Sequence, residues 1–306
     1  MQIDPNFKLF DEITVQSPFF YQLTQLGFIK ITGNDAKKFL QGQLTCDVEK
    51  ITSTHNTMAA HCNPQGRMIS LFYLFLFEED YYLLMHKSMI KIALSALQKY
   101  AVFYKVQLSD ASDTFSSMGC LHFTSCKFNN VALINIPSTT QRCLFVGEKK
   151  IIEKILQTAT QPIYGPQEWH YLDITEALPT LYPETSGKFL PHELKLHEFH
   201  AIDFQKGCYT GQEIIARMHY RGKLKNDLYK ASIISQLPLL PGTDIYAVEN
   251  REAHVSGIIV DVYEMTDQSF YTLILVDKVH AKNQTLFLKE ENEIFFTMIN
   301  ENEYDN

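Results

Sequence analysis

Residues 206–213 of the chain read KGCYTGQE, the densest group of chemically useful side chains in the sequence. Cys208 stands just before a helix that we predict to begin at Thr210, and the unpaired N–H groups of a helix start favour an anion nearby. Lys206 adds a positive charge, and both effects favour the thiolate. The pattern indicates a reactive or ligand-binding cysteine. A free cysteine is more often a small buried side chain, and periodicity alone favours that alternative.

The segment downstream of Cys208 is predicted to be a basic helix followed by a change of architecture. Thr210 and Glu213 have the spacing of a capping box, and the apolar positions that follow predict a helix over 210–219. The basic run comprises Arg217, His219, Arg221, Lys223 and Lys225. Such a run can hold a carboxylate or a phosphate, although most charge runs are solvated surface.

After residue 221 the pattern changes to short strands separated by turn residues. Five runs have strand character without an intervening helix, namely 228–232, 243–248, 255–263, 270–276 and 294–299. This texture predicts a small closed β-barrel. We therefore expect an α+β protein with one region over 1–220 and a C-terminal barrel over 221–306.

Upstream, the sequence predicts a hairpin and contains a single tryptophan. Thr57–Cys62 and Arg67–Phe77 read as strands joined by the turn residues NPQG at 63–66. Trp169 could stack on a flat heterocycle, but a lone tryptophan at helical spacing more often belongs to the core.

The composition of the chain limits the classes of protein to which it can belong. The chain has 306 residues, which suggests about two domains. Its net charge of −8 argues against a protein whose main task is to grip nucleic-acid backbones. The six cysteines form no CxxC pair, which argues against a zinc ribbon. The N-terminus lacks the features of a secretory signal, and the longest apolar run, 68–77, is too short to span a bilayer, so we expect a cytoplasmic protein.

The segment KGCYTGQE resembles the signature of the YgfZ family, folate-binding proteins related to the T-protein, the aminomethyltransferase of glycine cleavage. Further segments resemble that family in the same order, namely ITGNDAKKFLQGQLTCDV (31–48), AAHCNPQGRM (59–68), LQKYAVFYKV (97–106), SGKFLP (186–191) and ARMHYRG (216–222). The resemblance implies a three-lobed ring with two interwoven α/β lobes, a C-terminal β-barrel and a folate, tetrahydrofolate or a derivative, in a central cavity.

The resemblance also implies site residues. One family tryptophan that contacts folate falls on Trp169, and the other falls on Leu26, which cannot stack in the same way. A glutamate of the T-proteins falls on Thr175, with Glu176 beside it. Arg217 and Glu213 are expected to shape the folate site, while Cys208 is the working thiol, kept anionic by Lys206. No metal site is implied.

The most informative departure from the T-proteins concerns their acidic pair. The strand that follows the NPQG turn carries the catalytic carboxylate in those enzymes, whereas Ser70 and Leu71 occupy the two positions here. Neither side chain can act as an ionised acid–base group. The YgfZ branch shares this loss, so a classical aminomethyltransferase is not expected.

The resemblance thus implies a folate-binding accessory protein that supports the assembly or repair of iron–sulfur enzymes, including those that modify tRNA by methylthiolation. An aminomethyltransferase-like one-carbon transferase is the alternative. A direct tRNA-binding role has only the basic run 217–225 in its favour, and the net charge opposes it. Folate and iron–sulfur enzymes are therefore the expected partners, without strong nucleic-acid binding and without a membrane.

Overall fold

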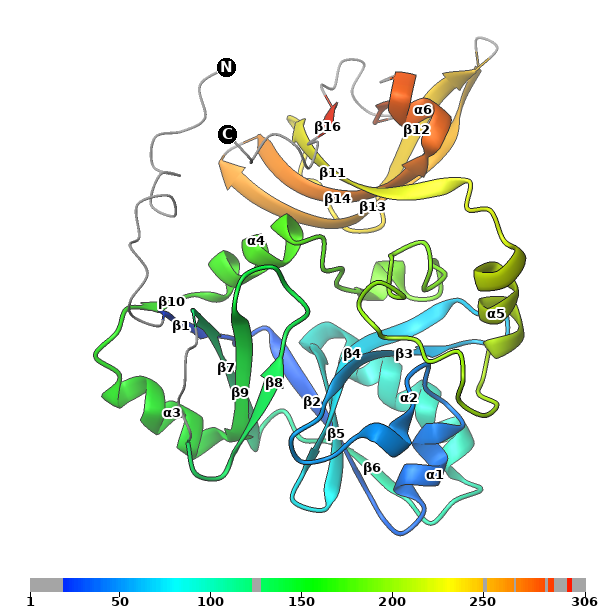
Figure 1. Ribbon diagram of the computed structural model, residues 1–306. Helices are drawn as coiled ribbons and strands as arrows, with labels where there is room; N and C mark the ends of the chain where they lie inside the picture. Colours follow the sequence, from blue (N-terminus) through cyan, green and yellow to red (C-terminus); the bar gives the residue numbers. More distant parts are fainter. Residues whose placement is uncertain are drawn as a thin grey trace.

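The computed structural model describes residues 19–122, 128–249, 252–266, 268–283, 286–288 and 296–298. Its strands form three sheets that surround the middle of the molecule (Figure 1). The first sheet has the order β3-β4-β5-β2-β6. Its strands are β2 (Leu26–Thr32), β3 (Thr57–Cys62), β4 (Met68–Phe77), β5 (Asp80–His86) and β6 (Gln107–Asp110). The predicted hairpin is thereby confirmed as β3 and β4.

The second sheet is interwoven with the first. Its order is β10-β1-β7-β9-β8, made of β1 (Phe19–Gln22), β7 (Phe115–Leu121), β8 (Val131–Asn135), β9 (Arg142–Glu148) and β10 (Ile163–Tyr164). The described part of the chain therefore starts in the second sheet, builds the entire first sheet, and only then returns to complete the second. Strand β1 pairs antiparallel with β7 and parallel with β10, which confirms two interwoven α/β lobes.

The third sheet is curled into a half-barrel at the top of Figure 1. Its order is β15-β12-β13-β14-β11-β16, with β11 (Asn226–Ile234), β12 (Asp244–Glu249), β13 (Glu252–Thr266), β14 (Ser269–Asp277), β15 (Leu286–Phe287) and β16 (Phe296–Met298). The expectation of a helix-free tail was wrong, because α6 (Lys278–Asn283) follows β14. The rest of the strand predicted over 294–299 lies outside the described residues.

Helices cover the sheets and lead from one lobe to the next. They are α1 (Ala36–Gln41), α2 (Ile90–Ala101), α3 (Lys149–Thr158), α4 (Pro166–Thr175) and α5 (Gln212–Arg221). Helix α4 packs beneath β13 and β14 of the third sheet, and α5 precedes β11. Side chains of α4 thus connect the second sheet with the half-barrel.

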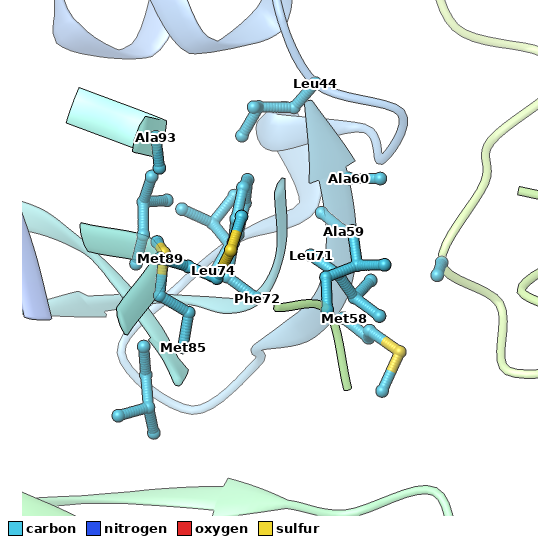
Figure 2. Close-up of a cluster of buried hydrophobic side chains, with 14 of the residues drawn as sticks. Leu44, Met58, Ala59, Ala60, Leu71, Phe72, Leu74, Met85, Met89 and Ala93 are labelled. Carbon is cyan, nitrogen blue, oxygen red and sulfur yellow. The ribbon is translucent and has the colours of Figure 1, made fainter. Parts of the chain in front are cut away.

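The core of the first lobe fills the space between its sheet and α2. Figure 2 shows side chains of β3, β4 and β5 gathered with those of α2, including Ala59, Phe72, Met85 and Ala93. These side chains are all buried. The apolar run of β4 supplies both faces of the sheet, because successive side chains of a strand point in opposite directions.

One polar pair is enclosed in this core. His61 of β3 stands opposite Ser70 of β4, and both side chains are fully buried. Neither ring nitrogen of His61 nor the Ser70 hydroxyl has a hydrogen-bond partner among the described residues. Burial lowers the pKa of His61 to about 4, because the charged imidazolium is poorly solvated there.

This pair gives a pH prediction. Because the folded pKa of His61 lies below its unfolded value, the unfolded chain binds a proton first on acidification, and stability is lost between about pH 6.5 and about pH 4. In urea titrations, the free energy of unfolding of the wild type should fall by about 2 kcal/mol more than that of His61→Leu between about pH 7 and about pH 5. The exposed His55 supplies the control variant His55→Leu, whose free energy of unfolding should fall with pH as steeply as that of the wild type. Equal slopes for all three proteins would contradict the assignment.

Candidate functional site

A cavity of about 360 Å³ lies where the three lobes meet. Strands β4 and β5, helix α4, the segment 178–182 and Val262 of β13 contribute its walls. The lining is mainly aliphatic and aromatic, with a few polar side chains. A volume of this size and such a lining are typical of sites for small organic molecules.

Trp169 of α4 forms part of the cavity wall and is almost fully buried. A Cβ atom at Gly119 would lie 2.4 Å from the indole ring, so only glycine at that position of β7 lets the tryptophan pack there. The edge of Tyr21 meets the indole at a ring-centroid distance of 5.2 Å, and the guanidinium of Arg142 lies 5.0 Å from its centroid. The tryptophan is therefore held in a fixed orientation.

Leu26 and Leu71 line the same cavity. Of the two positions where the T-proteins carry acids, the one that faces the cavity is thus occupied by leucine. Ser70, the neighbour of Leu71 in β4, is fully buried and does not contribute to the lining. The strand therefore presents no carboxylate to a molecule bound in the cavity.

The polar groups of the lining are concentrated on α4 and on the residues around it. Asp173 accepts a hydrogen bond from Arg142 at 2.8 Å, while burial raises the pKa of Asp173 despite that partner. His170 lies 2.8 Å from Asp261 of β13, measured from Nε2 to Oδ1. No lysine or arginine lines the cavity in the described part of the chain.

Glu176, the residue at the C-terminal cap of α4, lies outside this lining. Both of its carboxylate oxygens accept hydrogen bonds from Thr139 and Thr140. Burial by itself would raise the pKa of Glu176, but these bonds and the nearby Arg142 bring it below its ordinary value. The neighbouring Thr175 hydroxyl donates to the carbonyl of Leu172. The structure thus gives Glu176 a bond to the loop between β8 and β9.

The segment 206–213 is anchored on both sides of Cys208. The ammonium of Lys206 is buried and donates to the carbonyls of Gln41, Leu44 and Cys46 at 2.7, 2.8 and 2.7 Å. Burial lowers the pKa of Lys206 to about 8, so the group stays mostly protonated at neutral pH. An ammonium has three N–H donors, and all three are used. Lys206 therefore has no N–H left for the Cys208 thiol.

The second anchor follows Cys208. The backbone N–H of Thr210 donates to Gly42, and its hydroxyl lies 3.3 Å from Oε1 of Gln43. Gly211 adopts a left-handed conformation with φ of 85°, and a Cβ atom there would lie 2.6 Å from the carbonyl oxygen of Asn63. Only glycine fits this turn against the β3–β4 hairpin.

These contacts correct the predicted helix start. Helix α5 begins at Gln212 rather than at Thr210, and its N-cap is Gly211, without a side-chain cap. The predicted capping box of Thr210 and Glu213 was wrong, because the threonine hydroxyl bonds to Gln43 instead. The thiol of Cys208 thus stands four positions before the helix begins.

Cys208 itself is exposed, unlike Cys46, Cys62, Cys120 and Cys143, which are buried. Cys126 lies outside the described residues. Glu213 and Arg217 are exposed on α5. The neighbouring His219 stacks on Phe204 with ring centroids 3.7 Å apart. The thiol is thus accessible, and helix α5, which follows it in the chain, presents polar and aromatic side chains to the surface.

The structure therefore places the expected site residues in three groups. Leu26 and Trp169 both line the cavity. Lys206 and Cys208 belong to the segment that leads into α5, Glu213 and Arg217 belong to α5 itself, and none of these four lines the cavity. Glu176 bonds to the loop after β8. Sequence reasoning missed His170, Tyr182 and Asp261, for which no motif or spacing gives a signal.

Two negative observations complete the geometry. Within the described ranges, no group of three or more His, Cys, Asp and Glu side chains gathers in a way that could hold a metal ion. Among the same residues no helix is both long enough and apolar enough to cross a membrane.

The fold is that of the glycine-cleavage T-protein. The aminomethyltransferase T of the glycine cleavage system from Bartonella henselae superimposes with a TM-score of 0.68, covering 94% of this chain and 86% of that chain. The sequences are 12% identical, so this likeness establishes the architecture alone. No protein-family model matches the chain.

The curated relatives define the family within that fold. The tRNA-modifying protein YgfZ of Vibrio vulnificus is 36% identical over 223 residues, covering 69% of this chain and 68% of the relative. The protein of the same name from Aliivibrio fischeri is 32% identical over 265 residues, covering 83% of each chain. An uncharacterized protein of Haemophilus influenzae is 32% identical over 277 residues, covering 89% and 94%. The chain belongs to the YgfZ family.

Proposed function

We propose that the protein binds a folate, tetrahydrofolate or a derivative, and supports the assembly or repair of iron–sulfur enzymes in the cytoplasm, including enzymes that modify tRNA. The cavity beside Trp169 carries this proposal. Its volume and apolar walls suit a flat heterocycle, and its polar groups on α4 suit the edge of one. The relatives named as tRNA-modifying proteins support the link to tRNA modification.

The cavity is assigned to the heterocycle and not to the glutamate tail of a folate. A carboxylate tail needs a cation, and the described lining holds none of the lysine or arginine side chains that provide one. Trp169 would supply the flat wall, and Leu26 and Leu71 would supply the apolar surface around it. Bound folate would bring its one-carbon chemistry, while the chain's own residues bind it and exclude water.

Cys208 is the proposed working thiol, acting at the surface and not inside the cavity. It is the one exposed cysteine among the five that the structure describes, and its flanking residues are firmly anchored. The client is then an iron–sulfur enzyme that docks at this surface. Strong direct binding of tRNA is not part of the proposal, because the chain carries a net charge of −8.

An aminomethyltransferase is the alternative that the T-protein fold favours. Leu71 opposes it, because the cavity-facing position of the acidic pair has no ionisable group. Turnover of an aminomethyl-lipoyl substrate with tetrahydrofolate would decide for the transferase. We expect no turnover above the background without protein.

Folate binding is testable by calorimetry. Tetrahydrofolate should bind the wild type, and Trp169→Ala should weaken binding at least about tenfold, because stacking on an aromatic side chain contributes about 1–3 kcal/mol. Phe103→Ala, at an exposed aromatic residue, should bind as the wild type does. Thermal melts of each variant separate lost binding from lost folding, and Trp169→Phe keeps an aromatic wall if the alanine variant does not fold. The absence of heat with the wild type would refute the folate proposal.

A further inference from the structure

Three polar side chains from distant parts of the chain converge at the edge of the cavity. His170 belongs to α4, Tyr182 to the segment that follows it, and Asp261 to β13. The Oδ1 atom of Asp261 lies 2.8 Å from Nε2 of His170 and accepts a hydrogen bond of 2.9 Å from the Tyr182 hydroxyl. His170 and Tyr182 also line the cavity, so a bound molecule would touch this group.

Asp261 is completely buried, although it is a carboxylate. Its Oδ1 atom also accepts from the backbone N–H of Val262 at 2.9 Å, whereas Oδ2 has no partner among the described residues. A buried carboxylate is costly unless a charged or hydrogen-bonding partner compensates it. The ring of His170 faces the carboxylate from the neighbouring lobe, where its protonated form would be that partner.

The environment of His170 supports a protonated ring. Burial alone would lower the pKa of His170, but the charge of Asp261 and the hydrogen bond to it outweigh burial and raise the pKa above its ordinary value. The other titratable groups around the ring are His86 of β5, Asp173 of α4 and Tyr263 of β13. Burial lowers the pKa of His86 and raises the pKa of Asp173, so it disfavours the charged form of each group.

With Nε2 directed at Asp261, the other ring nitrogen remains available. No hydrogen bond to Nδ1 of His170 is found among the described residues. Imidazole rings held by a carboxylate at one nitrogen commonly act as proton donors or acceptors at the other. Here the acting nitrogen belongs to a side chain of the cavity wall.

We propose that His170 is a proton-exchanging binding residue of the cavity, which donates a hydrogen bond from Nδ1 to an acceptor atom on the edge of a flat heterocycle. Asp261 and Tyr182 are positioning residues, because they hold the ring from the opposite side. When the acceptor is basic enough, the proton passes from Nδ1 to it, and His170 becomes neutral with its remaining proton on Nε2, facing Asp261. No other atom is exchanged. The inference rests on the proposed folate site.

The sign of the pH dependence follows from this geometry. Protonated His170 donates at Nδ1, whereas the neutral ring with its proton on Nε2 directs a lone pair at the acceptor atom. Ligand affinity should therefore be highest at low pH and fall as the pH rises through the raised pKa of His170. Calorimetry with tetrahydrofolate under anaerobic conditions should show about tenfold weaker binding at about pH 8.5 than at about pH 6, since a hydrogen bond to a charged group is involved.

The test compares wild type, His170→Gln and the surface control His55→Gln. Glutamine can still donate to Asp261, so the variant should fold, and its affinity should be independent of pH and equal to the weak high-pH value of the wild type. His55→Gln should follow the wild type. Asp261→Asn should move the midpoint of the profile to lower pH, an effect that a merely structural role would not produce.

A measurement on the wild type alone guards against a misfolded variant. In ring-nitrogen NMR spectra, the Nδ1 signal of His170 should shift when tetrahydrofolate is added. An unmoved signal, or a His170→Gln variant that binds with the wild-type pH profile, would overturn this inference and leave the folate site intact. Failure of the wild type to bind tetrahydrofolate would overturn both.

Discussion

Replacing Cys208 with alanine should abolish the ability of the protein to rescue cells that lack a YgfZ-type protein, measured as methylthiolated tRNA nucleosides by mass spectrometry. The thiol is exposed, so the free energy of unfolding should change by no more than about 0.5 kcal/mol. The expected loss is large because a hydroxyl or methyl group cannot replace a cysteine sulfur as a nucleophile or metal ligand. Cys208→Ser should fail in the same way.

The matched control for this experiment is Cys120→Ala. Cys120 is buried in a small cluster of the second sheet with Met118 and Phe145, so its truncation should lower stability by about 1 kcal/mol and leave rescue unchanged. The two variants thus exchange effects: one loses function and keeps stability, and the other does the reverse. Full rescue by Cys208→Ala would remove the thiol from the mechanism and leave the cavity as the working site.

The sequence predicts those parts of the structure that depend on local sequence patterns. The β3–β4 hairpin follows from two apolar runs around NPQG, and the resemblance correctly implied the interwoven lobes. The two positions on which the family's tryptophans fall, Leu26 and Trp169, both line one cavity. Local pattern and family resemblance suffice there because neighbouring residues or a shared fold determine the outcome.

Contacts between distant segments could not be predicted in the same way. Lys206 bonds to carbonyls some 160 positions earlier in the chain, and His170 meets Asp261 across 91 positions. No periodicity or motif encodes such pairs. The false capping box at Thr210 has the same origin, because a tertiary contact with Gln43 competes with the local hydrogen bond that the spacing favours.

Lys206→Met should be the most destabilising single change in the KGCYTGQE segment. Methionine has about the length of lysine but no donor, so the carbonyls of Gln41, Leu44 and Cys46 lose the partner that they share. Each buried acceptor left unpaired costs about 1–3 kcal/mol, so we expect urea titrations to show a free energy of unfolding lower by about 3 kcal/mol or more. Rescue should fall with stability, because the loop that presents Cys208 loses its anchor.

The same experiment separates two roles for this lysine. If Lys206 served mainly to keep the Cys208 thiol ionised, Lys206→Met would retain stability and lose only rescue. The buried ammonium with all three N–H groups on carbonyls favours the opposite order, in which folding is lost first. Lys223→Met, at an exposed lysine after α5, should change neither quantity and controls for the loss of one positive charge. A Lys206→Met protein that is stable but fails to rescue would instead support a direct role of Lys206 in the chemistry of the Cys208 thiol.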